Sequence, residues 1–142
     1  GIDHIIFSPP YAQIMTKKEH SSSLDATLGD GILSYSKHPD NIANLNEFLY
    51  HQKMEIIYRK ALKSLNPEGT LTIIIKDHMR GRKRVFLGER AKRDCERLGF
   101  EFFEQYKWLA PGSVYTHIYR ARGWETVDDE DILILRKPGG KA

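Results

Sequence analysis

The stretch Ile2-Asp3-His4-Ile5-Ile6-Phe7-Ser8-Pro9-Pro10-Tyr11 decides the fold class of this chain. Residues 2–7 form a short and nearly continuous apolar run, which predicts a strand in the interior of a parallel sheet rather than an amphipathic edge strand. The two prolines end this strand, because neither can donate to a β-ladder and each restricts the residue before it to extended geometry. We therefore expect a rigid S-P-P-Y turn, residues 8–11, directly after the first strand.

The next regular element is expected to be an amphipathic helix. Residues 12–43 show little periodicity and many Ser, Gly, Asp and Asn residues, so we expect a long loop there. Asn44 followed by Glu47 resembles a capping box, with Asn in place of Ser or Thr. Apolar residues then recur at spacings of three and four, namely Tyr50, Met54, Ile57, Ala61 and Leu65. The turn residues Asn66-Pro67-Glu68-Gly69 end this helix.

Further strands and a second helix follow. Residues 70–76 are rich in Leu and Ile and predict a buried strand. After a basic loop, residues 85–98 predict a helix that Gly99 ends. Residues 100–109 and 131–137 predict two more strands, while residues 113–130 are ambiguous. This alternation of elements predicts an α/β fold with a mainly parallel sheet and an antiparallel C-terminal strand.

The bulk composition favours one compact domain. The chain has 142 residues, of which 40% are hydrophobic and 29% charged, as in globular proteins. No apolar run approaches the roughly 20 residues that span a bilayer, and no signal-peptide pattern is present. We therefore expect a cytoplasmic protein. Because the first strand begins almost at Gly1, we expect the chain to be a piece of a longer protein, with residues 138–142 as a tail or linker.

The positive charge is unevenly distributed. The formal net charge is only +3, but five basic residues fall within nine positions: Lys76, Arg80, Arg82, Lys83 and Arg84. This cluster indicates either a polyanionic partner or a solvated basic loop. The single cysteine, Cys95, shares a helical stripe with apolar residues, so we interpret it as a core residue rather than a nucleophile.

The S-P-P-Y turn and its context resemble those of amino-methyltransferases that act on DNA. The signature of that family is Asp, Asn or Ser followed by Pro-Pro-Tyr, and the Ser form is most similar to the cytosine-N4 branch. Downstream, Leu65-Asn66-Pro67-Glu68-Gly69 and the strand ending at Asp77 are similar to the family's helix, L-x-P-x-G turn and strand. The resemblance covers roughly the whole chain and the catalytic half of such an enzyme, residues 1–137, which implies a partial Rossmann-like fold.

The resemblance implies a chemistry that suits these residue types. An exocyclic amine is a weak nucleophile, because its lone pair is delocalised into the base ring. Ser8 Oγ and the Pro9 carbonyl would accept its two N–H groups, and Pro10 would keep the turn rigid. Tyr11 would stack on a target base flipped out of the duplex. The methyl donor would be S-adenosylmethionine, with Ser8 also near it, and transfer would depend mainly on positioning. Neither a metal nor a covalent intermediate is required.

The other candidate residues carry open alternatives. Trp108 is either a second wall of the base pocket or a core residue. Arg80, Arg82, Lys83 and Arg84 would contact DNA phosphates. Asp77 is either a family-like polar residue or a residue with a cap or turn role. The six histidines lack the spacing of a zinc site, and residues 128–131 are interpreted as a solvated acidic turn rather than a cation site.

The family's cofactor half carries a Gly-rich turn of the type F-x-G-x-G, which is not evident in this sequence. Gly29-Asp30-Gly31 is the only G-x-G, and no buried strand precedes it. We therefore expect the cofactor-binding half to lie in the same or another chain, and we leave open whether the protein is a homodimer. An adenine-N6 target is the nearest alternative. An RNA guanine-N2 or protein-glutamine methyltransferase and a non-catalytic nucleic-acid-binding module are further alternatives.

Overall fold

A computed structural model describes residues 1–10, 39, 41–42, 45–109 and 114–140. The chain divides into two compact units, one formed by Gly1–Pro9 and Tyr58–Ala142 and the other by Pro10–Ile57. Among the described residues, no helix combines the length and the apolarity that a membrane span requires.

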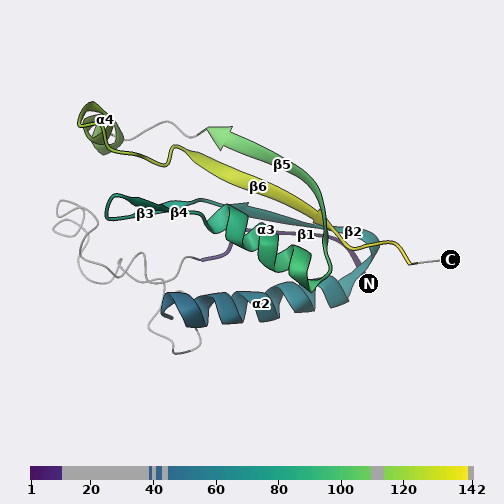
Figure 1. The fold of residues 1–142 in the computed structure, drawn as a ribbon. Coiled ribbons are helices and arrows are strands. Elements are labelled where there is room, and N and C mark those ends of the chain that lie inside the picture. The colour runs from purple at the N-terminus through teal and green to yellow at the C-terminus, as the bar shows by residue number, and fades with distance from the viewer. Residues whose placement is uncertain (11–38, 40, 43–44, 110–113, 141–142) are drawn as a thin grey trace. The chain divides into compact units, whose positions relative to one another are not determined.

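The first unit is built on a four-stranded mixed sheet (Figure 1). Its strands are β1 (Ile2–Phe7), β2 (Leu65–Ile75), β5 (Glu101–Leu109) and β6 (Asp129–Arg136), in the order β1-β2-β6-β5. β1 is parallel to β2, and β6 is antiparallel to both β2 and β5. Three strands therefore run in one direction and the C-terminal strand runs against them, which confirms the expected strand directions. β6 is inserted between β2 and β5 instead of extending the sheet at its edge.

Strand β1 has the predicted bounds, but in the described part of the chain it is an edge strand. It pairs with β2 alone, and Ile2 and Ile6 are 49% and 68% exposed. The expectation of an interior strand is therefore wrong for the described sheet. An apolar run indicates that a strand is suited to burial, but it does not show how many neighbours the strand has.

One face of the sheet forms the core together with helix α3 (Leu87–Leu98). The β2–β6 register places Leu71 opposite Leu135 and Ile73 opposite Leu133, and all four side chains are at most 1% exposed. α3 contacts β5 and β6 and contributes the buried Leu87, Ala91 and Cys95. The helix ends at Gly99, which has φ 114 and a left-handed conformation, as expected. The interpretation of Cys95 as a core residue is confirmed.

Helix α2 (Glu47–Ser64) begins at a cap that differs from the expected one. The Leu49 N–H donates to Asn46 Oδ1 at 2.9 Å, and the Tyr50 N–H donates to the Asn46 carbonyl at 2.8 Å, so Asn46 is the N-cap. The expected cap residue, Asn44, lies outside the described residues. The predicted apolar stripe is confirmed, since Tyr50, Met54, Ala61 and Leu65 are buried and Ile57 is half-buried.

The turn between α2 and β2 is tighter than expected, and β2 already begins at Leu65. Glu68 has φ 69, the only positive φ of a non-glycine residue among those described. Gly69 has no room for a side chain, because a Cβ there would lie 2.8 Å from the Asn66 carbonyl oxygen and 3.0 Å from that of Asp3. The L-x-P-x-G sequence therefore lets the backbone of this turn approach β1 closely.

Two segments that the sequence left irregular are regular. The basic loop is a hairpin formed by β3 (His78–Arg80) and β4 (Lys83–Val85), with a two-residue turn at Gly81-Arg82. Gly81 has φ 64, as the first turn position of a type II′ hairpin requires. The ambiguous segment contains helix α4 (Val114–Ala121).

The close approach at Gly69 yields a stability prediction. Gly69→Ala should lower the free energy of unfolding by about 1–3 kcal/mol, because two backbone oxygens would have to move. Gly140→Ala is the matched control, since nothing lies within 4 Å of a Cβ at that position, and we expect a change within about 0.5 kcal/mol. Urea denaturation of both variants measures the difference. Equal stability of the two variants would contradict the account of this turn.

Candidate functional site

The candidate residues of the first unit gather at one edge of the sheet. Phe7 ends β1 and pairs with Ile73, and Ile75 ends β2 opposite Asp131 of β6. β5 ends at Leu109, which pairs with Asp129 at the start of β6. The carboxyl ends of β1, β2 and β5 therefore meet at the edge where β6 begins. In open α/β sheets, this edge is where ligands bind.

The S-P-P turn leaves β1 at this edge. Ser8 is exposed, Pro9 is buried and Pro10 is half-buried. Ser8 and Pro9 belong to the sheet unit, whereas Pro10 belongs to the second unit. Tyr11 lies outside the described residues. The structure thus places an accessible hydroxyl directly after the strand, next to a proline whose backbone has a carbonyl but no N–H.

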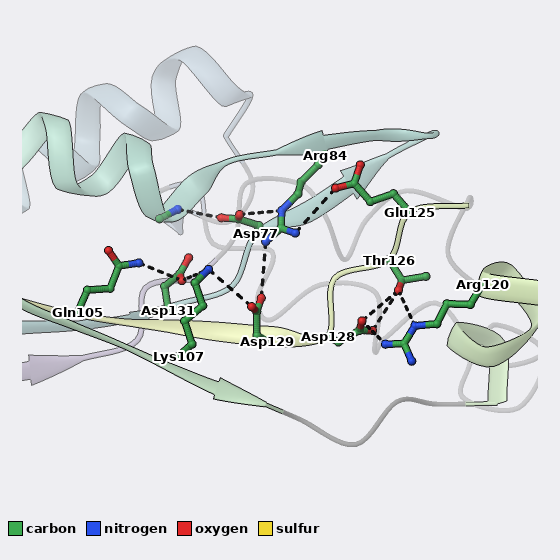
Figure 2. Close-up of polar contacts among 11 residues, drawn as sticks. Asp77, Arg84, Gln105, Lys107, Arg120, Glu125, Thr126, Asp128, Asp129 and Asp131 are labelled. Atoms are coloured by element: carbon green, nitrogen blue, oxygen red, sulfur yellow. Dashed lines mark hydrogen bonds and ion pairs between the residues drawn. The ribbon is translucent and has the colours of Figure 1, made fainter. Parts of the chain in front are cut away.

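Asp77 follows β2 and joins two other elements, the hairpin and α3 (Figure 2). Its side chain is 5% exposed. Asp77 Oδ1 accepts the Gly88 N–H at 3.0 Å, in the first turn of α3, and Oδ2 accepts Arg84 Nε of β4 at 3.0 Å. The carboxylate therefore caps α3 from a distant position in sequence and complements the positive end of its dipole. The cap alternative for Asp77 is confirmed.

A second buried carboxylate lies on the other side of the same helix turn. Asp131 is 4% exposed, and Lys107 Nζ lies 2.8 Å from its Oδ1. A Cβ on Gly88 would lie only 2.3 Å from Asp131 Oδ2, so the helix start passes directly over this carboxylate. Lys107 Nζ also lies 3.6 Å from Asp129 Oδ2, and Arg84 Nη2 lies 3.6 Å from Asp129 Oδ1. Asp129 thus links the two ion pairs.

The charged side chains in this network stabilise each other's ionised forms. The hydrogen bond to Asp131 raises the pKa of Lys107, against a smaller effect of burial. Burial lowers the pKa of Arg84, but its hydrogen bond and ion pair with Asp77, together with the charges of Asp129 and Glu125, raise the pKa overall. Both cations therefore remain charged at neutral pH. The network holds the hairpin and the start of α3 at the candidate edge.

This arrangement gives Arg84 a different environment from the other three residues that were predicted to contact phosphates. Arg84 is 19% exposed and its guanidinium faces Asp77, Glu125 and Asp129. We therefore assign it an internal role, which corrects its inclusion among surface cations. Arg80, Arg82 and Lys83 are exposed on the hairpin, and their contact with phosphates stays a prediction.

Trp108 lies near the same edge but on the far strand. It is 54% exposed, so the alternative that it packs in the core is wrong. The order β1-β2-β6-β5 separates it from Ser8 by three strand spacings, or roughly 14 Å. The described residues therefore do not bring Trp108 and Ser8 together, and a role of Trp108 at the target base stays a prediction.

The acidic segment 128–131 is not a solvated turn. Asp129 and Asp131 form the ion pairs described above, and Asp128 pairs with Arg120 of α4. Hydrogen bonding from Arg120, and from Thr126, lowers the pKa of Asp128. Among the described residues, no group of three or more His, Cys, Asp or Glu side chains could hold a metal ion. The ion pair of Lys107 and Asp131 was not predicted, because the direct pairing of these positions appears only when β5 and β6 lie side by side.

Comparisons with known proteins identify the fold. No protein-family model and no curated protein matches the chain. Among solved structures, the chain is similar to TTHA0409 of Thermus thermophilus, which is assigned as a DNA modification methylase and was solved in complex with S-adenosyl-L-methionine. The two sequences are 20% identical, and the TM-score is 0.60 over 99% of this chain and 49% of that chain. The cytosine-N4-specific PvuII DNA methyltransferase is 19% identical, with a TM-score of 0.59 over 95% of this chain and 43% of that one. The chain spans about half the length of these structures and shares their fold.

The ion pair of Asp77 and Arg84 should contribute measurably to stability. A double-mutant cycle with Asp77→Asn and Arg84→Gln should give a coupling free energy of about 1–3 kcal/mol, because both groups are largely removed from water. The control cycle uses the exposed pair of Arg136 and Glu101, 3.2 Å apart, and should give less than about 1 kcal/mol. Chemical denaturation measures both cycles. A coupling for Asp77 and Arg84 no larger than that of the control would contradict their central role.

Proposed function

We propose that this chain is the catalytic part of a DNA methyltransferase that transfers a methyl group from S-adenosylmethionine to the exocyclic amine of cytosine (N4). The observation that carries the proposal is the position of Ser8-Pro9, the part of the S-P-P turn that belongs to the sheet unit. This turn leaves β1 at the ligand-binding edge of a fold shared with two structures of the DNA methylase class. An adenine-N6 target is the alternative, since the same turn can hold either amine.

The residues at this edge can hold an amine in the required way. Ser8 Oγ and the Pro9 carbonyl are acceptors, so the two N–H groups of the amine would donate to them. Acceptors on both N–H groups draw the nitrogen toward tetrahedral geometry and free its lone pair. Because Pro9 and Pro10 limit the torsions of the turn, the acceptors are held in place before the amine arrives, and the rate gain comes from orientation. Tyr11 is proposed as the stacking surface for the flipped base.

The cofactor requires residues beyond those at the S-P-P turn. S-adenosylmethionine would supply the methyl group when bound, and TTHA0409 is a structural neighbour seen with that molecule. Ser8 is the residue of this chain that we place near it. Because the chain spans about half of the neighbours' length, we propose that a further half, in the same or another chain, provides most of the cofactor contacts.

The hairpin would face the DNA backbone. Arg80, Arg82 and Lys83 are exposed on β3, β4 and their connecting turn, beside the candidate edge. Arginine and lysine at such positions contribute sequence-independent affinity through phosphate contacts. A non-catalytic nucleic-acid-binding module would need this hairpin but not Ser8, which separates that alternative from the enzyme.

Ser8→Ala should abolish most methyl transfer while leaving DNA binding intact. We expect a loss of about 100-fold or more in kcat, by analogy with the removal of one positioned hydrogen-bonding group. DNA affinity should change by no more than about twofold, since it depends mainly on cationic phosphate contacts and the Ser8 hydroxyl is neutral. Ser64→Ala is the matched control, because its hydroxyl donates to the Lys60 carbonyl on α2. The assay uses the intact gene product, labelled cofactor and duplex DNA.

Mass spectrometry of the labelled product then identifies the base. We expect N4-methylcytosine, and N6-methyladenine would move the assignment to the alternative target. Label found only in RNA or protein would reject the DNA assignment. An unchanged rate in Ser8→Ala would reject the proposed site.

Residues 1–142 alone should bind S-adenosylmethionine weakly. Isothermal titration calorimetry on this segment should give no dissociation constant in the micromolar range or tighter, because most cofactor contacts are assigned to the other half. The intact gene product, titrated in parallel, is the control and should bind more tightly. Equal affinity in the two titrations would show that this chain holds the cofactor by itself and would contradict the division of the site.

A further inference from the structure

A basic and aromatic cluster joins the hairpin turn to the end of α4. The guanidinium carbon of Arg82 lies 4.2 Å from the centroid of the Trp124 ring, and that of Arg122 lies 5.5 Å from it. Tyr119 stacks on the same indole at 5.3 Å with an interplanar angle of 21°. One half-buried ring therefore gathers two exposed arginines from segments 40 positions apart in sequence.

The backbone after α4 fixes the position of this ring. Gly123 has φ 74, its N–H donates to the Arg120 carbonyl at 2.9 Å, and the Trp124 N–H donates to the Tyr119 carbonyl at 2.9 Å. These two bonds form a Schellman motif, and the stacking of Trp124 on Tyr119 is the side-chain contact that accompanies such a motif. The helix end therefore fixes the backbone of Trp124, and Tyr119 supports its ring.

A second contact ties the same segment to the hairpin (Figure 2). Glu125 Oε1 lies 3.9 Å from Arg84 Nη1, and Arg84 is held by Asp77. On the other side, Thr126 and Asp128 bind Arg120 of α4. The segment 124–128 is thus anchored to both the hairpin and α4. Trp124, its first residue, contacts Arg82 of the hairpin turn and Tyr119 of α4.

The two arginines on this ring retain their capacity to bind an anion. Stacking on an aromatic ring uses the flat face of a guanidinium and leaves its five N–H donors, which lie in the plane, available for a phosphate. Among the described residues, neither Arg82 nor Arg122 forms an ion pair. Both guanidinium groups lie near one ring, so their charges add in attracting an anion to this part of the surface.

We propose that Arg82, Arg122 and Trp124 form a phosphate clamp for the DNA backbone, in which Trp124 is a positioning residue. This inference rests on the proposed function and extends the predicted hairpin contacts to a second segment of the chain. Arg122 and Trp124 become part of the DNA-binding surface, although the basic cluster seen in the sequence contains neither. The clamp reads no sequence, because phosphates are the same at every base pair.

The test is the salt dependence of binding to a short mixed-sequence DNA duplex, measured by fluorescence anisotropy with the intact gene product. Arg82→Gln and Arg122→Gln should each lower the slope of log K against log salt by about 0.9, since each removes one phosphate contact. Arg93→Gln is the matched control, because Arg93 is exposed on α3, and its slope should remain that of the wild type. Trp124→Leu keeps both charges and should nevertheless lower the slope.

The outcomes separate the clamp from simpler explanations. Weaker binding of Trp124→Leu with an unchanged slope would overturn the positioning role, and equal slopes for Arg122→Gln and Arg93→Gln would overturn the clamp itself. If Trp124→Leu fails to fold, the slopes measured for the two arginine variants decide whether the clamp exists. A slope change seen with RNA but not with DNA would also overturn the proposal. Methyl transfer by the wild-type protein, measured in parallel, shows whether the proposed function holds independently of the clamp.

Discussion

The carboxylate of Asp77 is the constraint on which the candidate site depends. It is buried where β2 ends, accepts an N–H from the first turn of α3 and binds Arg84 of the hairpin. A buried carboxylate without such partners would be strongly unfavourable, so these elements must stay together. Asp129 then connects Arg84 to Lys107 and Asp131. The edge beside Ser8 is therefore supported by a continuous network of charges rather than by apolar packing alone.

The same network explains why the basic residues of the hairpin have different surroundings. Alternate positions of the hairpin are used differently, since Arg84 faces inward to three carboxylates and Arg82 lies over Trp124 near the surface. A charge cluster in sequence shows only that cations are close along the chain. Which of them is available to an anion depends on carboxylates that are distant in sequence, such as Asp129. We therefore separate the internal Arg84 from the proposed DNA surface.

Local sequence patterns predicted most of the helices and strands, but they did not predict which distant elements pair with one another. β1, α3 with its Gly99 cap, and β5 follow from apolar periodicity and turn residues within one segment. The insertion of β6 between β2 and β5, and the pairing of Lys107 with Asp131, depend on contacts between distant strands. In the same way, the S-P-P turn could be located from the sequence. The anchoring of Trp124 could not, because it depends on the backbone hydrogen bonds of the Schellman motif, which are known only from the structure. Trp108 shows the limit most clearly, because its distance from Ser8 follows only from strand order.

A crystal structure of the intact gene product bound to duplex DNA and a non-reactive cofactor analogue would show whether the S-P-P turn holds the target amine. The account predicts a base flipped out of the duplex, with its exocyclic amine about 3 Å from both Ser8 Oγ and the Pro9 carbonyl oxygen. A target amine held by other residues, or DNA bound with every base stacked and the S-P-P turn facing away from it, would contradict the account.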